Sequence, residues 1–184
     1  MMNMGDDMQL NSIIEQRIHN KRKILFEAGD HFLQPLDEAL KKASHKVNIL
    51  FAFRCLEDLS IILKEKSVDV ELLSHALRDA KSWASGEIKM PVVKKQILEI
   101  HQYAKQQSDP AIEAFLHAFA QGLSVVHTKK HAMGLPIYAL TGYVRDLVPS
   151  QYSEVIFDKI NEFIDCLSTI DLSNQNQKWA SFIK

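Results

Sequence analysis

The chain has few residues of the kind that make turns, with six glycines and five prolines among 184 residues. Most β folds of this length need more turn residues, so this scarcity favours helices. The chain also has no excess of charge of one sign. It has 22 basic and 23 acidic residues, and neither half of the chain holds an excess. A nucleic-acid-binding protein needs a basic face, so nucleic acid is not an expected partner.

Cysteine is scarce as well, and neither Cys55 nor Cys166 has the spacing of a disulfide framework or a metal site. We expect both thiols to be reduced and buried, and we expect no metal ion and no cofactor. No stretch approaches the ~18 uninterrupted apolar residues of a membrane span. Residues 1–9 are polar, whereas a signal peptide begins basic and continues apolar. These absences predict a cytoplasmic protein without a membrane partner.

Helical spacing dominates what is present. With 46% apolar and 24% charged residues the composition is that of a globular protein, and the length suits a single core. Apolar residues recur at intervals of three and four, as on one face of a helix. Asp69 and Gly86 are placed to cap the two ends of one helix, Pro91 to open the next, and Asp109-Pro110 to open a third.

Two of the predicted helices decide the architecture. Residues 47–63 are apolar on more than one side, which is typical of a helix in the middle of a bundle. The helix after Pro110 is expected to be the longest and to run to Met133, where Gly134 and Pro136 interrupt it. A last long helix is expected to begin near Ser150. The sequence therefore predicts an all-α, single-domain bundle of roughly six to eight helices.

Three segments are expected along the chain. Residues 45–170 should form the bundle, and residues 1–44 an N-terminal helical segment that packs on it, within which Ile24-Leu25-Phe26 fits either helix or strand. Residues 171–184 should form a polar loop and a short tail. The apolar residues of that tail, which can dock on the bundle or on a partner, are Trp179, Phe182 and Ile183.

Histidines are the main candidates for a site. His127 and His131 are four residues apart, so on a helix they share one face and can chelate a metal, and His117 lies close to that face. A zinc peptidase has a glutamate where Thr128 stands, and no third ligand is evident, so no metal ligand is assigned. The alternatives are histidines hydrogen-bonded within the bundle and a shared polar pocket. The candidate pocket residues are Trp83, His101, His127, His131 and Tyr138.

Charged residues interrupt the most apolar predicted helix. Arg54, Glu57 and Asp58 fall within it, where an unpaired charge would cost several kcal/mol. We therefore expect these residues to be paired or exposed at the edge of the helix, and of the two we favour a buried pair between the arginine and a carboxylate. The alternative is an arginine that anchors an anionic ligand.

Local signatures of catalysis are absent. The chain has no phosphate-binding loop, no serine nucleophile elbow, no C-x-x-C pair and no dinucleotide fingerprint. No catalytic residue is therefore assigned. An enzyme would have to assemble its site from separated helices, which leave no local signature.

A series of spaced motifs carries a resemblance to a known family. In chain order they are Cys55-Leu56-Glu57, Ala80, Trp83, Gly86-Glu87, His101, Gln121-Gly122, Val126-His127-Thr128, His131-Ala132, Gly134 and Tyr138. In order and spacing, over residues 45–146, they resemble the bacterial immunity-protein-five-like family of polymorphic toxin systems. The resemblance implies an all-helical fold and a non-enzymatic protein that binds and neutralises a cognate toxin.

Three functions stay open at this point. A toxin-binding protein would use Trp179, Tyr152 or clustered acids as exposed anchors. A helical ligand-binding protein or enzyme would have a pocket near the Trp83, His101, His127 and His131 elements. A homo-oligomer would pack its histidine face or its C-terminal tail on a second subunit.

Overall fold

The computed structural model describes residues 4–174 and 176–184, and in these residues it contains eight α-helices and no strand. The helices are α1 (Met4–His19), α2 (Gln34–Lys42), α3 (His45–Glu65), α4 (Glu71–Ala84), α5 (Met90–Lys105), α6 (Pro110–Ser124), α7 (Gly134–Asp146) and α8 (Tyr152–Ser168). Short 3-10 turns lie at His31–Leu33, Lys129–His131, Pro149–Gln151 and Leu172–Asn174. The all-α prediction is confirmed. The first residues of the polar N-terminal stretch and Gln175 of the predicted C-terminal loop lie outside the described residues.

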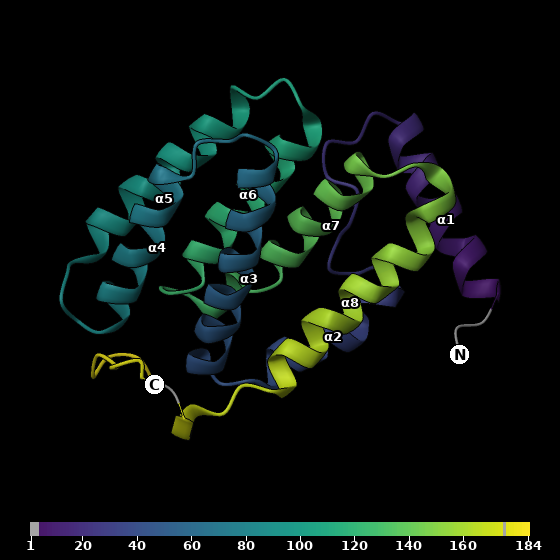
Figure 1. Cartoon of the computed structure of the whole chain (residues 1–184). Coiled ribbons are helices and arrows are strands. Elements are labelled where there is room, and N and C mark those ends of the chain that lie inside the picture. The colour runs from purple at the N-terminus through teal and green to yellow at the C-terminus, as the bar shows by residue number, and fades with distance from the viewer. Residues whose placement is uncertain (1–3, 175) are drawn as a thin grey trace.

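Helices α3 and α6 occupy the middle of the bundle, with α4 and α5 on one side and α7, α8 and α1 on the other (Figure 1). The buried positions of α3 lie on several of its faces, as its sequence predicted, and they include Ile49, Phe51 and Leu56. Phe115 and Phe119 of α6 are also fully buried. One apolar core therefore runs through the whole bundle.

Two glycines allow the central helices to approach closely. A Cβ atom added at Gly122 of α6 would lie 2.6 Å from Leu135 Cδ1 and 2.7 Å from Leu56 Cδ2. A Cβ atom added at Gly142 of α7 would lie 2.5 Å from Phe115 Cδ1. Both separations are far below a van der Waals contact, so a larger residue at either position would push α6 away from its neighbours.

The predicted helix ends are largely confirmed. The Asp109 carboxylate accepts a hydrogen bond from the Ala111 amide at 2.7 Å, and the Asp69 carboxylate accepts one from the Glu71 amide at 2.9 Å. Gly86 has φ of +82°, which is the left-handed conformation that ends a helix. The start of α8 at Tyr152 lies close to the predicted start near Ser150.

The predicted end of α6 at Met133 is wrong. Helix α6 ends at Ser124, and α3, with 21 residues, is longer than α6, with 15. Beyond Ser124 the backbone amides donate to the carbonyl three residues earlier instead of four. An example is the bond from the Val126 amide to the Leu123 carbonyl at 3.4 Å. Two consecutive β-branched residues, Val125 and Val126, are poor helix formers, and here both side chains are fully buried. The chain between α6 and α7 is therefore a loop.

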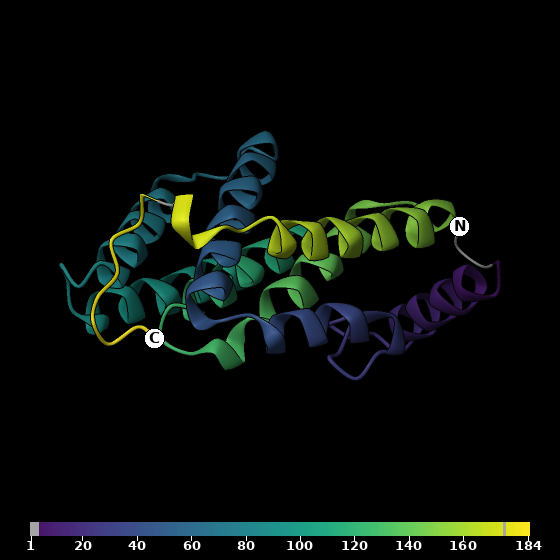
Figure 2. The ribbon, with the colours of Figure 1, turned by 90° about the horizontal axis from the view of Figure 1, so that it is seen from below.

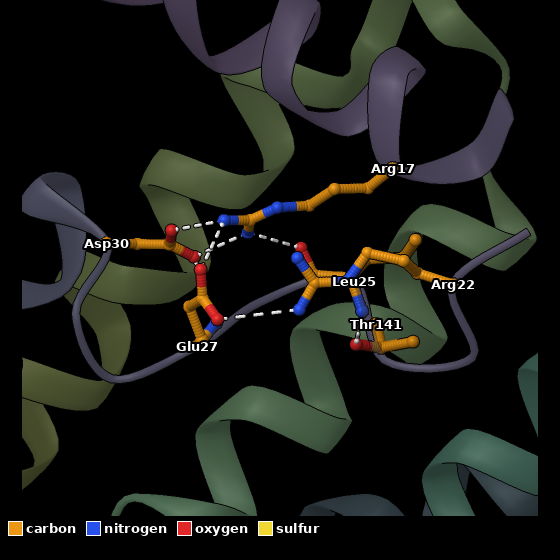
Figure 3. Close-up of polar contacts among 6 residues, drawn as sticks. All are labelled: Arg17, Arg22, Leu25, Glu27, Asp30 and Thr141. Atoms are coloured by element: carbon orange, nitrogen blue, oxygen red, sulfur yellow. Dashed lines mark hydrogen bonds and ion pairs between the residues drawn. The ribbon is translucent and has the colours of Figure 1, made fainter. Parts of the chain in front are cut away.

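Ile24-Leu25-Phe26, predicted to be helix or strand, is neither, and lies in the connection from α1 to α2. A buried ion pair holds this connection in place (Figure 3). Both terminal nitrogens of Arg17 donate to the Asp30 carboxylate, each at 2.6 Å, and Arg17 Nη1 also donates to the Leu25 carbonyl at 2.7 Å. The Leu25 amide donates to Thr141 Oγ1 at 3.1 Å. These bonds tie the connection to α1 and α7.

The C-terminal tail lies on α4, at the end of the molecule opposite α1 (Figures 1 and 2). The Ala180 amide donates to the Ala84 carbonyl at 2.8 Å, and the ring of Phe182 lies 5.0 Å from that of Trp83. Ile183 is buried. The tail thus packs on its own bundle in this structure.

We found no candidate for a membrane-spanning helix among the described helices. Throughout residues 4–174 and 176–184, no helix combines the length and the apolar character that a crossing requires.

Candidate functional site

The structure separates the predicted pocket residues into three places. Trp83 lies on α4, where it contacts the C-terminal tail. His101 of α5 and Tyr138 of α7 both lie against His117 of α6. His127 and His131 lie together in the loop between α6 and α7. A single pocket formed by all five predicted residues is therefore not present in the fold.

His101 forms a hydrogen bond with His117 of α6, which is not one of the five predicted pocket residues. Their Nδ1 atoms are 2.8 Å apart, and their ring centroids are 5.0 Å apart. One Nδ1 must donate while the other accepts, so the two nitrogens share one proton. On the other side, His117 Nε2 lies 3.8 Å from Glu113 Oε1, and the Tyr138 ring lies 5.4 Å from the His117 ring.

Burial keeps this histidine pair neutral. It lowers the pKa of His101, and the charges of His117 and Lys105 lower it further. It also lowers the pKa of His117, although the nearby Glu113 carboxylate acts in the opposite direction. Both rings are therefore predominantly uncharged at neutral pH, as their shared hydrogen bond requires.

A cavity of about 350 Å³ opens beside His117 and Tyr138. It is formed by the α1–α2 connection together with α5, α6 and α7, and cationic groups outnumber the single carboxylate in its lining. The charged and polar lining residues are Lys23, Lys105, Glu113, His117, Tyr138 and Arg145. Such a cavity has the charge to attract a small anion.

Sequence reasoning placed His117 near a histidine face but left it out of the candidate pocket. The signal that it belongs to a site is its pairing with Glu113 one helical turn earlier, in a helix that is otherwise almost entirely apolar. Its contact with His101 could not be found from spacing, because the two residues lie on different helices.

His127 and His131 meet, but not on a helix as predicted. Their ring centroids are 5.5 Å apart, and both side chains are exposed. Partial burial lowers the pKa of His127, and the charges of His131, Lys94 and His45 lower it further. Within the part of the chain that the structure describes, no group of three histidine, cysteine or acidic side chains is placed to hold a metal ion.

A groove of about 570 Å³ lies between this loop and α2. Its floor is apolar and is formed by Leu40, Ala132 and Met133, all of which are buried. Its rim is basic, with side chains of Lys41, Lys129 and Lys130. We call this feature the α2–loop groove. Lys129 Nζ donates to the Lys41 carbonyl at 2.6 Å, which fixes the loop against α2.

The predicted buried pair between Arg54 and a carboxylate is wrong. The Glu57 carboxylate is exposed and lies 2.6 Å from Lys81 Nζ on α4. Arg54 instead faces α8, where Nη1 donates to Thr169 Oγ1 at 3.4 Å. Asp58 is exposed at the edge of a different cavity, and its pKa is raised by partial burial and by the Glu57 charge. None of the three side chains is buried, since Glu57 and Asp58 are exposed and Arg54 is partly exposed.

Tyr152 is not an exposed anchor, because its side chain is only 6% exposed at the start of α8. Trp179 is half-buried, and Lys46 Nζ lies 5.7 Å from the centre of its ring. Neither aromatic side chain is therefore available as the free contact that a partner would use.

Comparison with known proteins gives one match. The family described as Imm-5 like putative immunity protein matches residues 38–163, which is more than half of the chain. No curated protein and no solved structure matches this chain.

Proposed function

The chain belongs to the Imm-5 like putative immunity protein family, and from this membership we propose that it binds a cognate toxin protein and neutralises it without catalysis. The family match is the observation that carries the proposal. It covers residues 38–42 of α2, the whole of α3 to α7 and most of α8. We therefore expect a toxin-binding surface common to the family to lie on those elements. We propose that the protein acts in the cytoplasm of a bacterium.

The α2–loop groove is the surface that we assign to the toxin. Apart from Asp37, the lining residues of the groove lie within the matched stretch. Several of them belong to the loop that contains His127 and His131. An apolar floor supplies contact area, while a basic rim favours an acidic partner and speeds its approach. A stable complex buries about 800 Å² on each partner, so the exposed histidines beside the groove would lie in the same interface.

Co-expression tests the proposal. The toxin domain encoded beside this gene should arrest growth when it is produced alone, and the wild-type chain should restore growth. The double variant Lys129→Glu/Lys130→Glu reverses the charge of the rim and should restore growth poorly. The matched control Lys64→Glu/Lys89→Glu makes the same change in net charge at exposed positions outside the groove. Failure of the wild-type chain to protect against the toxin would contradict the proposal.

A second candidate function is the binding of a small anion in the cavity beside His117 and Tyr138. The observation that favours it is the cluster of Lys23, Lys105 and Arg145 around that cavity. Titration with inorganic phosphate and with citrate, followed by NMR, should shift amide signals of α5 and α7. The variant Lys105→Gln should weaken the shifts. Unchanged spectra at millimolar phosphate and citrate would reject this function.

A further inference from the structure

The chain contains two cysteines, and the fold brings them together although they are far apart in sequence. Cys55 lies on α3 and Cys166 on α8, and each thiol shifts the pKa of the other. Both line a cavity of about 390 Å³ between α3, α7 and α8. Cys55 is buried, whereas Cys166 is only partly buried. A reagent that enters the cavity therefore meets Cys166 more readily than Cys55.

The surroundings of the two thiols shift their pKa values in opposite directions. The hydrogen bond from Cys55 lowers the pKa of Cys166, and a hydrogen bond and the positive charge of Arg54 lower it further, against burial and the charge of Asp58. The same thiol contact and burial raise the pKa of Cys55. Lys159 and Glu162 of α8 also line the cavity, with opposite charges. The thiolate is the nucleophilic form of cysteine, so Cys166 is the more reactive thiol.

We propose that Cys55 and Cys166 form a peroxide-sensitive pair, in which Cys166 is oxidised first and Cys55 then closes a disulfide between α3 and α8. The Cys166 thiolate attacks the terminal oxygen of a hydroperoxide. The O–O bond breaks, the alkoxide leaves with a proton as an alcohol, and Cys166 becomes a sulfenic acid. The Cys55 sulfur then attacks the Cys166 sulfur, and hydroxide leaves with the Cys55 proton as water. The two thiols lose two electrons, which reduce the hydroperoxide.

Two cysteines in a helix contact can also serve only as small apolar side chains. Three observations favour the reactive pair over this simpler role. Both thiols line the same cavity, Cys166 is the more exposed of the two, and Arg54 favours the thiolate of Cys166. The proposal does not depend on toxin binding, because none of the three observations involves the α2–loop groove.

Treatment of the reduced, full-length protein with hydrogen peroxide tests the pair. The intact mass should decrease by two hydrogens, and peptide mapping should find the Cys55–Cys166 bond within single chains. In Cys55→Ser, a sulfenic acid should accumulate at Cys166 and be trapped by dimedone. In Cys166→Ser, Cys55 should stay reduced. A wild-type protein that keeps both thiols, under peroxide that oxidises the denatured chain, would overturn the proposal.

A second measurement avoids the serine variants, in case they do not fold. The rate at which iodoacetamide alkylates Cys166 in the wild-type protein should rise at a lower pH than for an unfolded thiol. Arg54→Gln should slow the reaction several-fold at neutral pH. Arg78→Gln is the matched control, because it removes an exposed arginine on α4 that, unlike Arg54, does not act on the pKa of Cys166. Equal rates in the two variants, or a rate no faster than that of the denatured chain, would contradict the assignment of Cys166.

Discussion

Gly142 holds α7 against α6 through the absence of a side chain. Replacing it with alanine would place a methyl group 2.5 Å from Phe115 Cδ1, in a ring that is fully buried. We expect Gly142→Ala to lower the free energy of unfolding by about 1–3 kcal/mol. Gly29→Ala is the control, because no atom lies within 4 Å of the added methyl group. Urea unfolding of both variants measures the difference, and equal midpoints would show that α6 and α7 pack less closely.

The pair of His101 and His117 should make stability depend on pH. Burial lowers the pKa of both rings, so the unfolded chain binds more protons once the pH falls below about 6.5. Stability should be insensitive to the pair well above that pH and should fall as the pH decreases through it. The double variant His101→Gln/His117→Gln should show a shallower decrease.

Thermal unfolding across that pH range measures the effect. His75→Gln removes an exposed histidine on α4 and should leave the wild-type dependence unchanged. If the double variant loses stability as steeply as the wild-type protein, the two rings do not titrate differently in the folded and unfolded chains.

At the scale of elements, the ion pair of Arg17 and Asp30 secures the connection between α1 and α2. Both side chains are largely buried, and Asp30 also accepts from the Glu27 amide at 2.9 Å. Asp30→Ala would leave the guanidinium without its main partner, and we expect a loss of about 3 kcal/mol. Hydrogen exchange should speed up most in residues 22–33. Glu38→Ala, which removes an exposed pair with Lys42, should cost less than about 1 kcal/mol. Similar losses in the two variants would contradict this role.

The tail is a second element whose docking can be tested. Ile183 is buried, and Phe182 covers Trp83. Ile183→Asp should release the tail because a buried carboxylate without a partner is costly. The fluorescence of the two tryptophans, Trp83 and Trp179, should then shift to longer wavelength, while Lys184→Asp, at an exposed position, should leave it unchanged. An unshifted spectrum in the Ile183 variant would show that the tail does not depend on this contact.

The helix ends followed from sequence because they depend on neighbours along the chain. Asp109-Pro110 and Gly86 act through their own backbone, so a local pattern was sufficient to place them. The end of α6 could not be placed in the same way. Val125 and Val126 continue the apolar pattern of a helix, yet it is burial against the rest of the bundle that fixes their conformation.

Contacts between helices limited the prediction of the site. His101 and His117 meet across α5 and α6, and the two cysteines meet across α3 and α8, so no spacing in the sequence reports either pair. The same limit explains why the sequence predicts a carboxylate paired with Arg54, whereas Glu57 pairs with Lys81 on another helix. His127 and His131 were placed side by side for the wrong reason, because a loop and not a helix brings them together.

At the scale of the whole molecule, the balanced charge of the chain conceals a local imbalance. The net charge is -1, yet the rim of the α2–loop groove has three lysine side chains around an apolar floor. Asp37 also lines the groove, and it forms an ion pair with Lys41. Specificity for an acidic partner can therefore arise on one face without a charge field over the molecule. From the family to which the chain belongs, we propose that the partner of this face is a toxin.

Titration calorimetry of the purified chain with its proposed partner, a toxin domain to be sought in the adjacent gene, tests this account most directly. We expect saturable binding to the wild-type chain at one site, and at least about tenfold weaker binding to Lys129→Glu/Lys130→Glu, a loss of about 1.4 kcal/mol. Binding to Lys64→Glu/Lys89→Glu should match the wild type. No binding by the wild-type chain would contradict the function, and equal binding by all three proteins would contradict the assigned groove.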